Sequence, residues 1–187
     1  GREIHTIPLS VLRSSIGYVM QDNFLFSDTI RNNIAFGDRT KSFQEIEHAA
    51  KMACVHDNVM DFPDGYDTMV GERGVSLSGG QKQRISIARA LILDPKVLIL
   101  DDALSAVDTD TEEQILENLK RERRNKTNII IAHRISTLQN ADKIIVIDGA
   151  SIVEEGKHEE LVAKGGIYAD LYHRQLLEKM KKEEYKL

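Results

Sequence analysis

The feature that most constrains this fold is a short apolar run that ends in two carboxylates. Residues 97–100 are all apolar, and Asp101 and Asp102 follow them directly. A run of this kind is typical of a strand that is buried on both faces of a parallel sheet. Helical patterns precede and follow it, and a second apolar run occupies residues 129–131. This alternation predicts an α/β fold with a mostly parallel sheet.

The remaining patterns place further elements around that sheet. Residues 16–20 indicate a short strand, and residues 30–60 carry apolar side chains at helical spacing. Residues 144–147 indicate a strand that turns at Asp148 and Gly149 into a second one at 151–153. A helix is expected from Tyr168 onward.

Composition and charge exclude several classes of protein. The net charge of -5, from 25 basic and 30 acidic side chains, gives no broad attraction to nucleic acid or to an anionic membrane. The apolar runs reach only about four residues, whereas a membrane-spanning helix needs ~20. The first residues do not resemble a signal peptide. The single cysteine, Cys54, cannot form an internal disulfide, which favours a reducing cytosolic setting.

A second chemical feature, Leu-Ser-Gly-Gly-Gln at residues 77–81, precedes the apolar run. Two glycines at a helix start let backbone N–H groups approach a phosphate, and the helix dipole favours its negative charge. Ser78 can cap the helix or donate to the same phosphate. Carboxylates at the end of a parallel strand suit Mg²⁺. Each feature alone predicts only a helix cap or a solvated strand end, whereas the two in this order favour a nucleotide site.

Five ordered motifs resemble those of the ATP-binding cassette (ABC) ATPases, over roughly residues 1–172. Residues 77–81 are similar to the signature motif, residues 97–101 to the Walker B strand, and residues 104–108 to the D-loop. Gln21 resembles the Q-loop glutamine, and His133 resembles the switch histidine. The five motifs occur in the same order along this chain as in the family, which makes the resemblance highly specific.

The resemblance implies a P-loop NTPase-like core with a mostly parallel sheet and an inserted α-helical subdomain. Residues 1–21 are expected to contain the end of a core sheet region and the Q-loop, and residues 22–90 the helical subdomain with the signature motif. Residues 91–165 are expected to contain the core sheet with Walker B, the D-loop and the switch histidine. Residues 166–187 are expected to form the C-terminal helix.

The resemblance also implies ATP and Mg²⁺ as ligands and a role for each site residue. Gln21 and Asp101 are expected to hold Mg²⁺. Gln21, Asp102 and His133 are expected to serve catalysis, with His133 also contacting the γ-phosphate. The signature residues expected to bind ATP held by a second cassette are Ser78, Gly79, Gly80 and Gln81, and the D-loop residues expected at the dimer interface are Ser105, Ala106 and Asp108.

Three of these residues also have a purely structural interpretation. Gln21 could satisfy backbone groups at a strand end, and His133 could be a solvated cap. Asp108 could cap the helix that follows it, and this role is compatible with a place at the dimer interface.

Segments outside the five motifs resemble exporters. Residues 24–34 look like the segment after the Q-loop in exporter half-transporters, and residues 70–74 resemble the X-loop that touches the membrane domain. Residues 156–161 and 166–172 match exporter C-termini. The resemblance implies a second, non-identical cassette and a transmembrane domain as partners, the latter through the Gln21 and Gly71–Gly74 regions. It implies no nucleic acid partner, and a location at the cytoplasmic face of the cell membrane.

The sequence departs from the family in two places. No Gly-x-x-x-x-Gly-Lys-Ser/Thr motif occurs. We therefore expect the N-terminal part of the domain to be absent, one sheet face to be uncovered, and residues 1–187 alone to be inactive. Asp102 stands where the family has a glutamate as general base. Its shorter side chain predicts slow hydrolysis, as in one cassette of a heterodimeric multidrug exporter.

Other interpretations of the function stay open. A backbone shift or an extra water could restore the geometry, so that Asp102 works normally. The chain could be a mainly regulatory cassette that binds ATP and hydrolyses little of it. It could also be a soluble ATPase of DNA repair or translation, which the segment at residues 71–74 disfavours.

Overall fold

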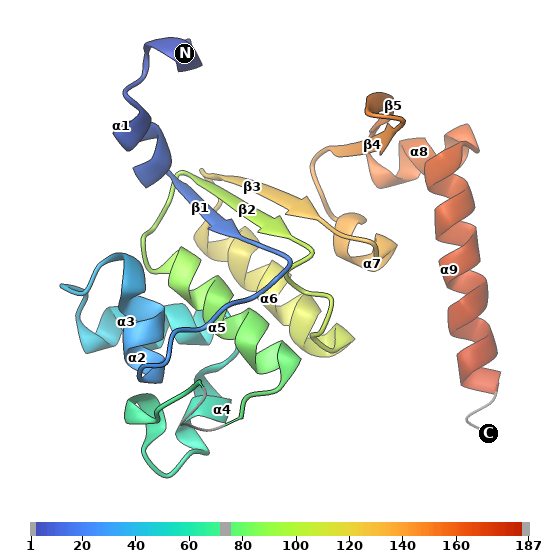
Figure 1. Cartoon of the computed structure of the whole chain (residues 1–187). Coiled ribbons are helices and arrows are strands. Elements are labelled where there is room, and N and C mark those ends of the chain that lie inside the picture. Colours follow the sequence, from blue (N-terminus) through green and yellow to red (C-terminus); the bar gives the residue numbers. More distant parts are fainter. Residues whose placement is uncertain (1–2, 72–75, 185–187) are drawn as a thin grey trace. The chain divides into compact units, whose positions relative to one another are not determined.

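The computed structural model describes residues 3–71 and 76–184, and the chain divides into two compact units, residues 1–131 and 132–187. Figure 1 shows the sheet and most of the helices in the first unit, and a hairpin with further helices in the second. The elements of the first unit are the 3₁₀ helices η1 (Ile4–Thr6), η2 (Ala35–Gly37) and η3 (Gly65–Asp67), the helices α1 (Leu9–Ser14), α2 (Ile30–Ile34), α3 (Phe43–Met52), α4 (His56–Met60), α5 (Gly79–Leu91) and α6 (Thr109–Glu122), and the strands β1 (Ile16–Val19), β2 (Val97–Asp101) and β3 (Thr127–Ile131).

The sheet of the first unit is parallel, as predicted. Its strands lie in the order β1-β2-β3, and the two strand pairs are both parallel. Tyr18 lies opposite Ile99, which in turn lies opposite Ile129. The carboxyl ends of all three strands therefore meet at one edge of the sheet, where parallel sheets place their ligands.

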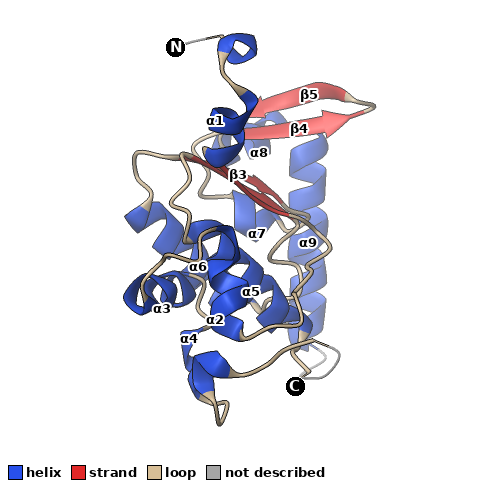
Figure 2. Ribbon diagram, turned by 60° about the vertical axis from the view of Figure 1, so that its left-hand side comes forward, coloured by secondary structure: helices blue, strands red, loops and turns tan. Residues whose placement is uncertain are grey.

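One face of this sheet forms the core of the first unit. Val19, Leu98 and Leu100 point to that face and are buried in one cluster with Ile85 of α5 and Ile115 of α6. Figure 2 shows helices α2 to α6 gathered on the same side of the strands. The helical spacing of apolar side chains explains this packing, because it gives each of these helices one face to bury.

The opposite face of the sheet remains open among the described residues. Tyr18, Ile129 and Ile131 are 51%, 44% and 49% exposed, although all are large side chains. On β2, Val97 and Ile99 are only partly buried. The expectation that residues 97–100 are buried on both faces is therefore wrong, since helices cover one face alone. The expectation of one uncovered sheet face is confirmed.

This apolar face predicts that residues 1–187 associate when expressed alone, because exposed patches of this kind mark contact surfaces. We expect the change Ile129→Lys to shift the fragment toward the monomer in sedimentation velocity. The change Gln114→Lys places the same charge on an exposed position of α6, and is expected to leave association unchanged. A fragment that is monomeric without either change would contradict the prediction.

The helical pattern predicted for residues 30–60 is present but interrupted. It is divided among α2, η2, α3 and α4. Helix α3 begins with a capping box, in which Ser42 accepts from the backbone of Glu45 and the Glu45 side chain accepts from the backbone of Ser42. The hydrogen bond from Lys41, followed by those from the backbone and hydroxyl of Ser42, lowers the pKa of the Glu45 carboxyl to about 2. Phe43, which shares the apolar spacing, is exposed and packs edge-on against Tyr66.

The second unit contains the predicted pair of strands and the C-terminal helix. Its strands are antiparallel and joined by a tight turn, and the buried Glu154 accepts hydrogen bonds from the backbone of Ile167 and Tyr168 at the start of the last helix. In the described part of the chain, no helix combines the length and the apolar character needed to cross a membrane. The elements of this unit are α7 (Ile135–Leu138), β4 (Ile144–Asp148), β5 (Ser151–Gly156), α8 (His158–Lys164) and α9 (Ile167–Glu184).

Candidate functional site

The predicted signature motif forms the start of helix α5. Ser78 is the N-cap, and its Oγ accepts a hydrogen bond from the backbone N–H of Gln81 at 3.2 Å. The Gln81 Oε1 accepts in return from the backbone N–H of Ser78 at 2.9 Å. This capping box fixes the first turn. The predicted helix cap at Ser78 is thus confirmed, while its contact with a phosphate stays a prediction.

The two glycines of this turn lie against the loop that follows β2. A Cβ atom on Gly80 would lie 2.8 Å from the carbonyl oxygen of Ala106, closer than side chains normally approach backbone. A Cβ on Gly79 would lie 3.4 Å from the Cβ of Ala106, which is an ordinary contact. Gly80 is therefore required for the packing of this loop, whereas an added Cβ atom at Gly79 would fit.

Three predicted residues lie at the carboxyl edge of the sheet. Asp101 ends β2, and Asp102 follows in the left-handed region with φ of 49°. The backbone N–H of Asp102 donates to the carbonyl of Ile131 at 2.9 Å. Gln21 is exposed, two residues beyond the end of the neighbouring β1. The parallel pairing of β1 and β2 brings these three residues to one edge.

His133 follows β3 by two residues and belongs to the second unit. It is exposed, and its carbonyl accepts a hydrogen bond from Gln175 Nε2 of α9 at 2.7 Å. The first unit therefore contains Gln21, Asp101 and Asp102, whereas His133, which is expected to serve the same nucleotide, belongs to the second unit.

Tyr18 is a site residue that the sequence did not reveal. Its hydroxyl donates to Oδ2 of Asp101 at 2.9 Å, across the pairing of β1 and β2. This hydrogen bond to a carboxylate raises the pKa of Tyr18. The contact depends on strand pairing between residues 83 positions apart, so no local pattern predicts it.

The predicted D-loop follows the two aspartates and leads into α6. Asp108 is the N-cap of α6, and its Oδ1 accepts from the backbone N–H of Thr111 at 3.0 Å. This bond lowers the pKa of Asp108. The structural role considered for Asp108 is therefore confirmed. Ser105 and Ala106 are exposed at the turn before it, and a place at a dimer interface stays a prediction for all three.

Arg89 of α5 holds the segment that follows Gln21. Its guanidinium donates to the carbonyl of Phe24 at 2.9 Å, and to the carbonyl and the side-chain oxygen of Asn33 at 2.7 and 2.8 Å. It also lies over the rings of Phe26 and Phe36, which stack on each other. The helix that carries the signature turn is therefore joined directly to the region predicted to contact a membrane domain.

The same region meets the start of the predicted X-loop. The backbone N–H of Val70 donates to the carbonyl of Asp28, and that of Ile30 donates to the carbonyl of Thr68, each at 3.0 Å. Gly71 lies against Ser27. Residues 72–74, which complete the predicted X-loop, lie outside the described residues.

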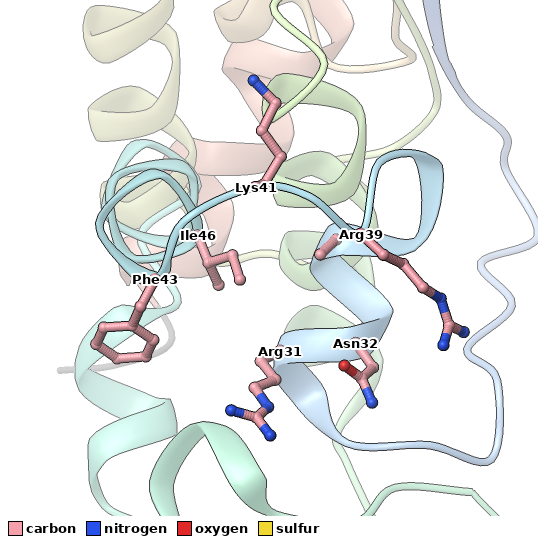
Figure 3. Close-up of a pocket in the computed structure, with 7 residues that line it drawn as sticks. Arg31, Asn32, Arg39, Lys41, Phe43 and Ile46 are labelled. Atoms are coloured by element: carbon pink, nitrogen blue, oxygen red, sulfur yellow. The ribbon is translucent and has the colours of Figure 1, made fainter.

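A cavity of ≈ 190 Å³ near α2 and α3 contains several basic side chains but lacks the features of an anion site. Figure 3 shows Arg31, Arg39 and Lys41 pointing in different directions around it. Each of the three already pairs with a carboxylate of the chain, at 3.0, 3.6 and 2.8 Å. We therefore assign this cavity no ligand. The lining residues are Arg31, Asn32, Ala35, Arg39, Lys41, Phe43 and Ile46.

The oxygen donors at the sheet edge fit a magnesium ion that is shared with a nucleotide. In residues 3–71 and 76–184, no group of three or more His, Cys, Asp and Glu side chains is arranged to hold a metal. Mg²⁺ in nucleotide sites is typically bound by one or two carboxylates, with phosphates and waters as its other ligands. The Asp101 carboxylate and the Gln21 amide agree with that donor set.

Comparisons with known proteins show the family of this chain. A family model described as "ABC transporter" matches residues 1–105. The multidrug resistance-like ATP-binding protein MdlA of Escherichia coli (strain K12) is 54% identical over 93% of this chain and 30% of its own length. ATP-binding cassette sub-family B member 6 of Xenopus tropicalis is 49% identical over 94% of this chain and 21% of its own length.

A solved structure, that of a bacterial Atm1-family ABC exporter with ATP bound, superposes with a TM-score of 0.88. It is 44% identical, and the match covers 92% of this chain and 30% of that one. The chain thus spans less than a third of the length of each of these relatives.

The parallel sheet with its signature turn and paired aspartates is the fold of an ABC ATPase domain. The chain belongs to the ABC transporter family, and within it the chain is similar to exporters.

Proposed function

We propose that this chain is part of the ATP-binding domain of an ABC exporter, and that it takes part in ATP hydrolysis that energises transport across a membrane. One observation carries the proposal. The first turn of α5, where N–H groups have no partner within the helix ladder, lies directly against the loop that follows Asp101 and Asp102. A phosphate-binding element and a carboxylate site are thus parts of one rigid arrangement.

Each residue at the sheet edge, and His133, has a separate proposed role in ATP hydrolysis. Asp101 and Gln21 offer oxygen atoms to Mg²⁺, which would neutralise phosphate charge when it is bound with ATP. Asp102 accepts a proton from the attacking water, and Gln21 orients that water. His133 contacts the γ-phosphate through its ring.

The signature turn serves ATP held on a second cassette. Ser78, Gly79, Gly80 and Gln81 contribute to this contact: the two glycines offer backbone N–H groups, Ser78 and Gln81 hold the turn through their capping box, and the helix dipole favours the negative charge of the nucleotide. Ser105, Ala106 and Asp108 lie at the interface between the two cassettes. The exposed position of Ser78 and Gly79 at the start of α5 supports this arrangement.

A transmembrane domain is the second proposed partner, at the cytoplasmic face of the cell membrane. Its contact region comprises the segment after Gln21 and the start of the X-loop at Gly71. The hydrogen bonds between residues 28–30 and 68–70 support a common contact surface. Phe24 and Phe36, which are 63% and 45% exposed, give that surface an aromatic character.

Asp102 supports a finer proposal, in which this chain is the slower cassette of a heterodimeric multidrug exporter. Its side chain is shorter by one methylene than the usual glutamate, which shortens its reach by about 1.5 Å. A mainly regulatory cassette would bind ATP and hydrolyse little of it, even with a glutamate at position 102. The two possibilities are separated by the test of Asp102 in the Discussion.

The proposed function is tested with the whole protein reconstituted in lipid vesicles. We expect Mg²⁺-dependent release of phosphate from ATP, and a decrease of about 10²-fold on the change Asp101→Asn, because a charge-stabilising group is lost. The change Asp110→Asn removes an equal charge from the exposed first turn of α6, and is the matched control. The absence of ATP hydrolysis in the unmodified protein would refute the proposal.

The hydroxyl of Tyr18 leads to a separate prediction. It orients the Asp101 carboxylate, and loss of such a partner typically weakens metal binding by about 10-fold to 100-fold. We expect the change Tyr18→Phe to raise the Mg²⁺ concentration for half-maximal ATPase activity by about 10-fold, with maximal activity largely restored at high Mg²⁺. The measurement is a Mg²⁺ titration at fixed ATP. An unchanged titration would show that this hydrogen bond has no part in metal binding.

A further inference from the structure

Gln83 is a buried amide between the signature helix and the loop after β2. It lies one turn beyond the signature residues on α5 and is 5% exposed. Its Oε1 accepts a hydrogen bond from the backbone N–H of Ala106 at 2.9 Å. Its Nε2 donates to the Oγ of Ser105 at 3.1 Å, and more weakly to the carbonyl of Asp102 at 3.5 Å.

Ser105 completes a short network around the same carbonyl. Its hydroxyl accepts from Gln83 and donates to the carbonyl oxygen of Asp102 at 2.9 Å. The backbone N–H of Ser105 points to that oxygen as well, at 3.4 Å. The left-handed backbone of Asp102 is thus held by groups that Gln83 orients from the signature helix.

We propose that Gln83 is a positioning residue that couples the signature turn to Asp102 through the loop at residues 102–106. This inference rests on the proposed function. It adds a physical connection between two parts of the chain that act on different nucleotides. The signature turn serves ATP held on the partner cassette, whereas Asp102 serves ATP held on this chain.

The geometry makes this connection stiff. The first turn of α5 packs closely on the loop, since a Cβ atom on Gly80 would lie 2.8 Å from the carbonyl oxygen of Ala106. It cannot shift away without breaking the hydrogen bonds of Gln83, and a buried amide without partners is costly. A displacement of the signature turn is therefore transmitted to the backbone that carries the Asp102 carboxylate.

This coupling predicts an effect on the rate of hydrolysis and not on binding. Gln83 is buried and touches no position expected to contact ATP, so nucleotide affinity has no reason to change. Misplacement of a catalytic group by about 1 Å can lower the rate by roughly 10²-fold. Because the loop would lose only part of its hydrogen bonding, we expect a smaller decrease in the rate of hydrolysis.

The test uses the whole protein in lipid vesicles and the change Gln83→Met, which keeps the volume and removes both hydrogen-bonding atoms. We expect kcat for ATP to fall about 10-fold while KM changes by less than about 2-fold, as for an interaction made in the transition state. The control is Ser86→Ala, on the same helix. Ser86 is also buried, and its hydroxyl has no hydrogen-bond partner among the described residues, so the change should alter neither parameter.

Thermal melting distinguishes positioning from a purely structural role. A structural role would lower the melting temperature and leave kcat of the folded protein unchanged. A wild-type kcat in the folded Gln83→Met protein would overturn the inference. If that variant does not fold, the exposed Ser105 provides the second test, because Ser105→Ala removes the other end of the connection. We expect it to lower kcat at constant KM, and an unchanged kcat would overturn the inference.

A double-mutant cycle adds a direct measure of the coupling. If Gln83 acts through Ser105, the protein with both changes should be no slower than the one with Gln83→Met alone. Independent, multiplying losses would contradict that route. A protein that hydrolyses no ATP before any change would refute the proposed function, whereas normal hydrolysis that is insensitive to Gln83 would refute only the coupling.

Discussion

The change Gly79→Asp is expected to abolish ATP hydrolysis in the assembled transporter while leaving the domain folded. Gly79 lies at the first position of α5, where a backbone N–H has no partner within the helix ladder. A carboxylate at this position would repel the nucleotide and block the approach of its phosphate. Because a Cβ on Gly79 makes only an ordinary contact with Ala106, the fold should accept the side chain. We expect a loss of at least about 10²-fold in phosphate release.

Two other glycines provide the controls for this experiment. Gly149→Asp introduces the same charge into an open turn of the second unit, where nothing lies within 4 Å of an added Cβ and where aspartate adopts the left-handed backbone, with φ of 52°, more readily than most side chains do. Its turnover should equal that of the unmodified protein. Gly80→Ala should instead impair folding, since the added atom meets the Ala106 carbonyl at 2.8 Å. Normal turnover with Gly79→Asp would remove the signature turn from the mechanism.

The second large effect is expected from Asp102→Glu. If the short side chain of Asp102 limits proton transfer from the attacking water, the longer one should restore reach and raise turnover at this site. A deficit of ~1 Å can cost roughly 10²-fold in rate, and we expect a gain of that order. The competing view, in which a backbone shift or an added water compensates, predicts little gain.

The measurement isolates the site that Asp102 serves. In the proposed heterodimeric transporter, the glutamate expected at the matching position of the partner cassette is changed to glutamine, so that only the Asp102 site can turn over. Single-turnover hydrolysis is then compared with and without Asp102→Glu, at saturating ATP and Mg²⁺. Rapid hydrolysis before the change would show that Asp102 is a competent base, and a homodimer would then be the simpler model. No hydrolysis in either form would favour a regulatory cassette.

Features set by neighbouring residues could be predicted from the sequence. Ser78 was expected to cap a helix, because a hydroxyl followed by two glycines and a glutamine has the chemistry of a helix start, and the structure contains a full capping box there. Asp108 as a cap and the strand turn at Gly149 follow from equally local rules. The parallel sheet could be predicted as well, because its apolar strands alternate with helices.

Contacts between distant residues could not be predicted in the same way. The hydrogen bond from Tyr18 to Asp101 depends on the register of two strands, and no pattern within either strand reveals that register. In the sequence, Gln83 and Arg89 have the pattern of ordinary polar positions on a helix. In the structure, both side chains form hydrogen bonds with loops that are distant in sequence. The burial of β2 on one face only could not be predicted for a related reason, since an apolar run does not show which of its faces other elements will cover.

The left-handed backbone at Asp102 has a consequence for how such a site evolves. This conformation strains most side chains by about 1–2 kcal/mol, whereas aspartate adopts it more readily than glutamate does. An exchange of glutamate for aspartate at this position is therefore expected to relieve some backbone strain. The codons of the two residues differ only in their last base, so the exchange needs a single mutation. The reverse exchange, Asp102→Glu, is therefore expected to carry a cost in stability.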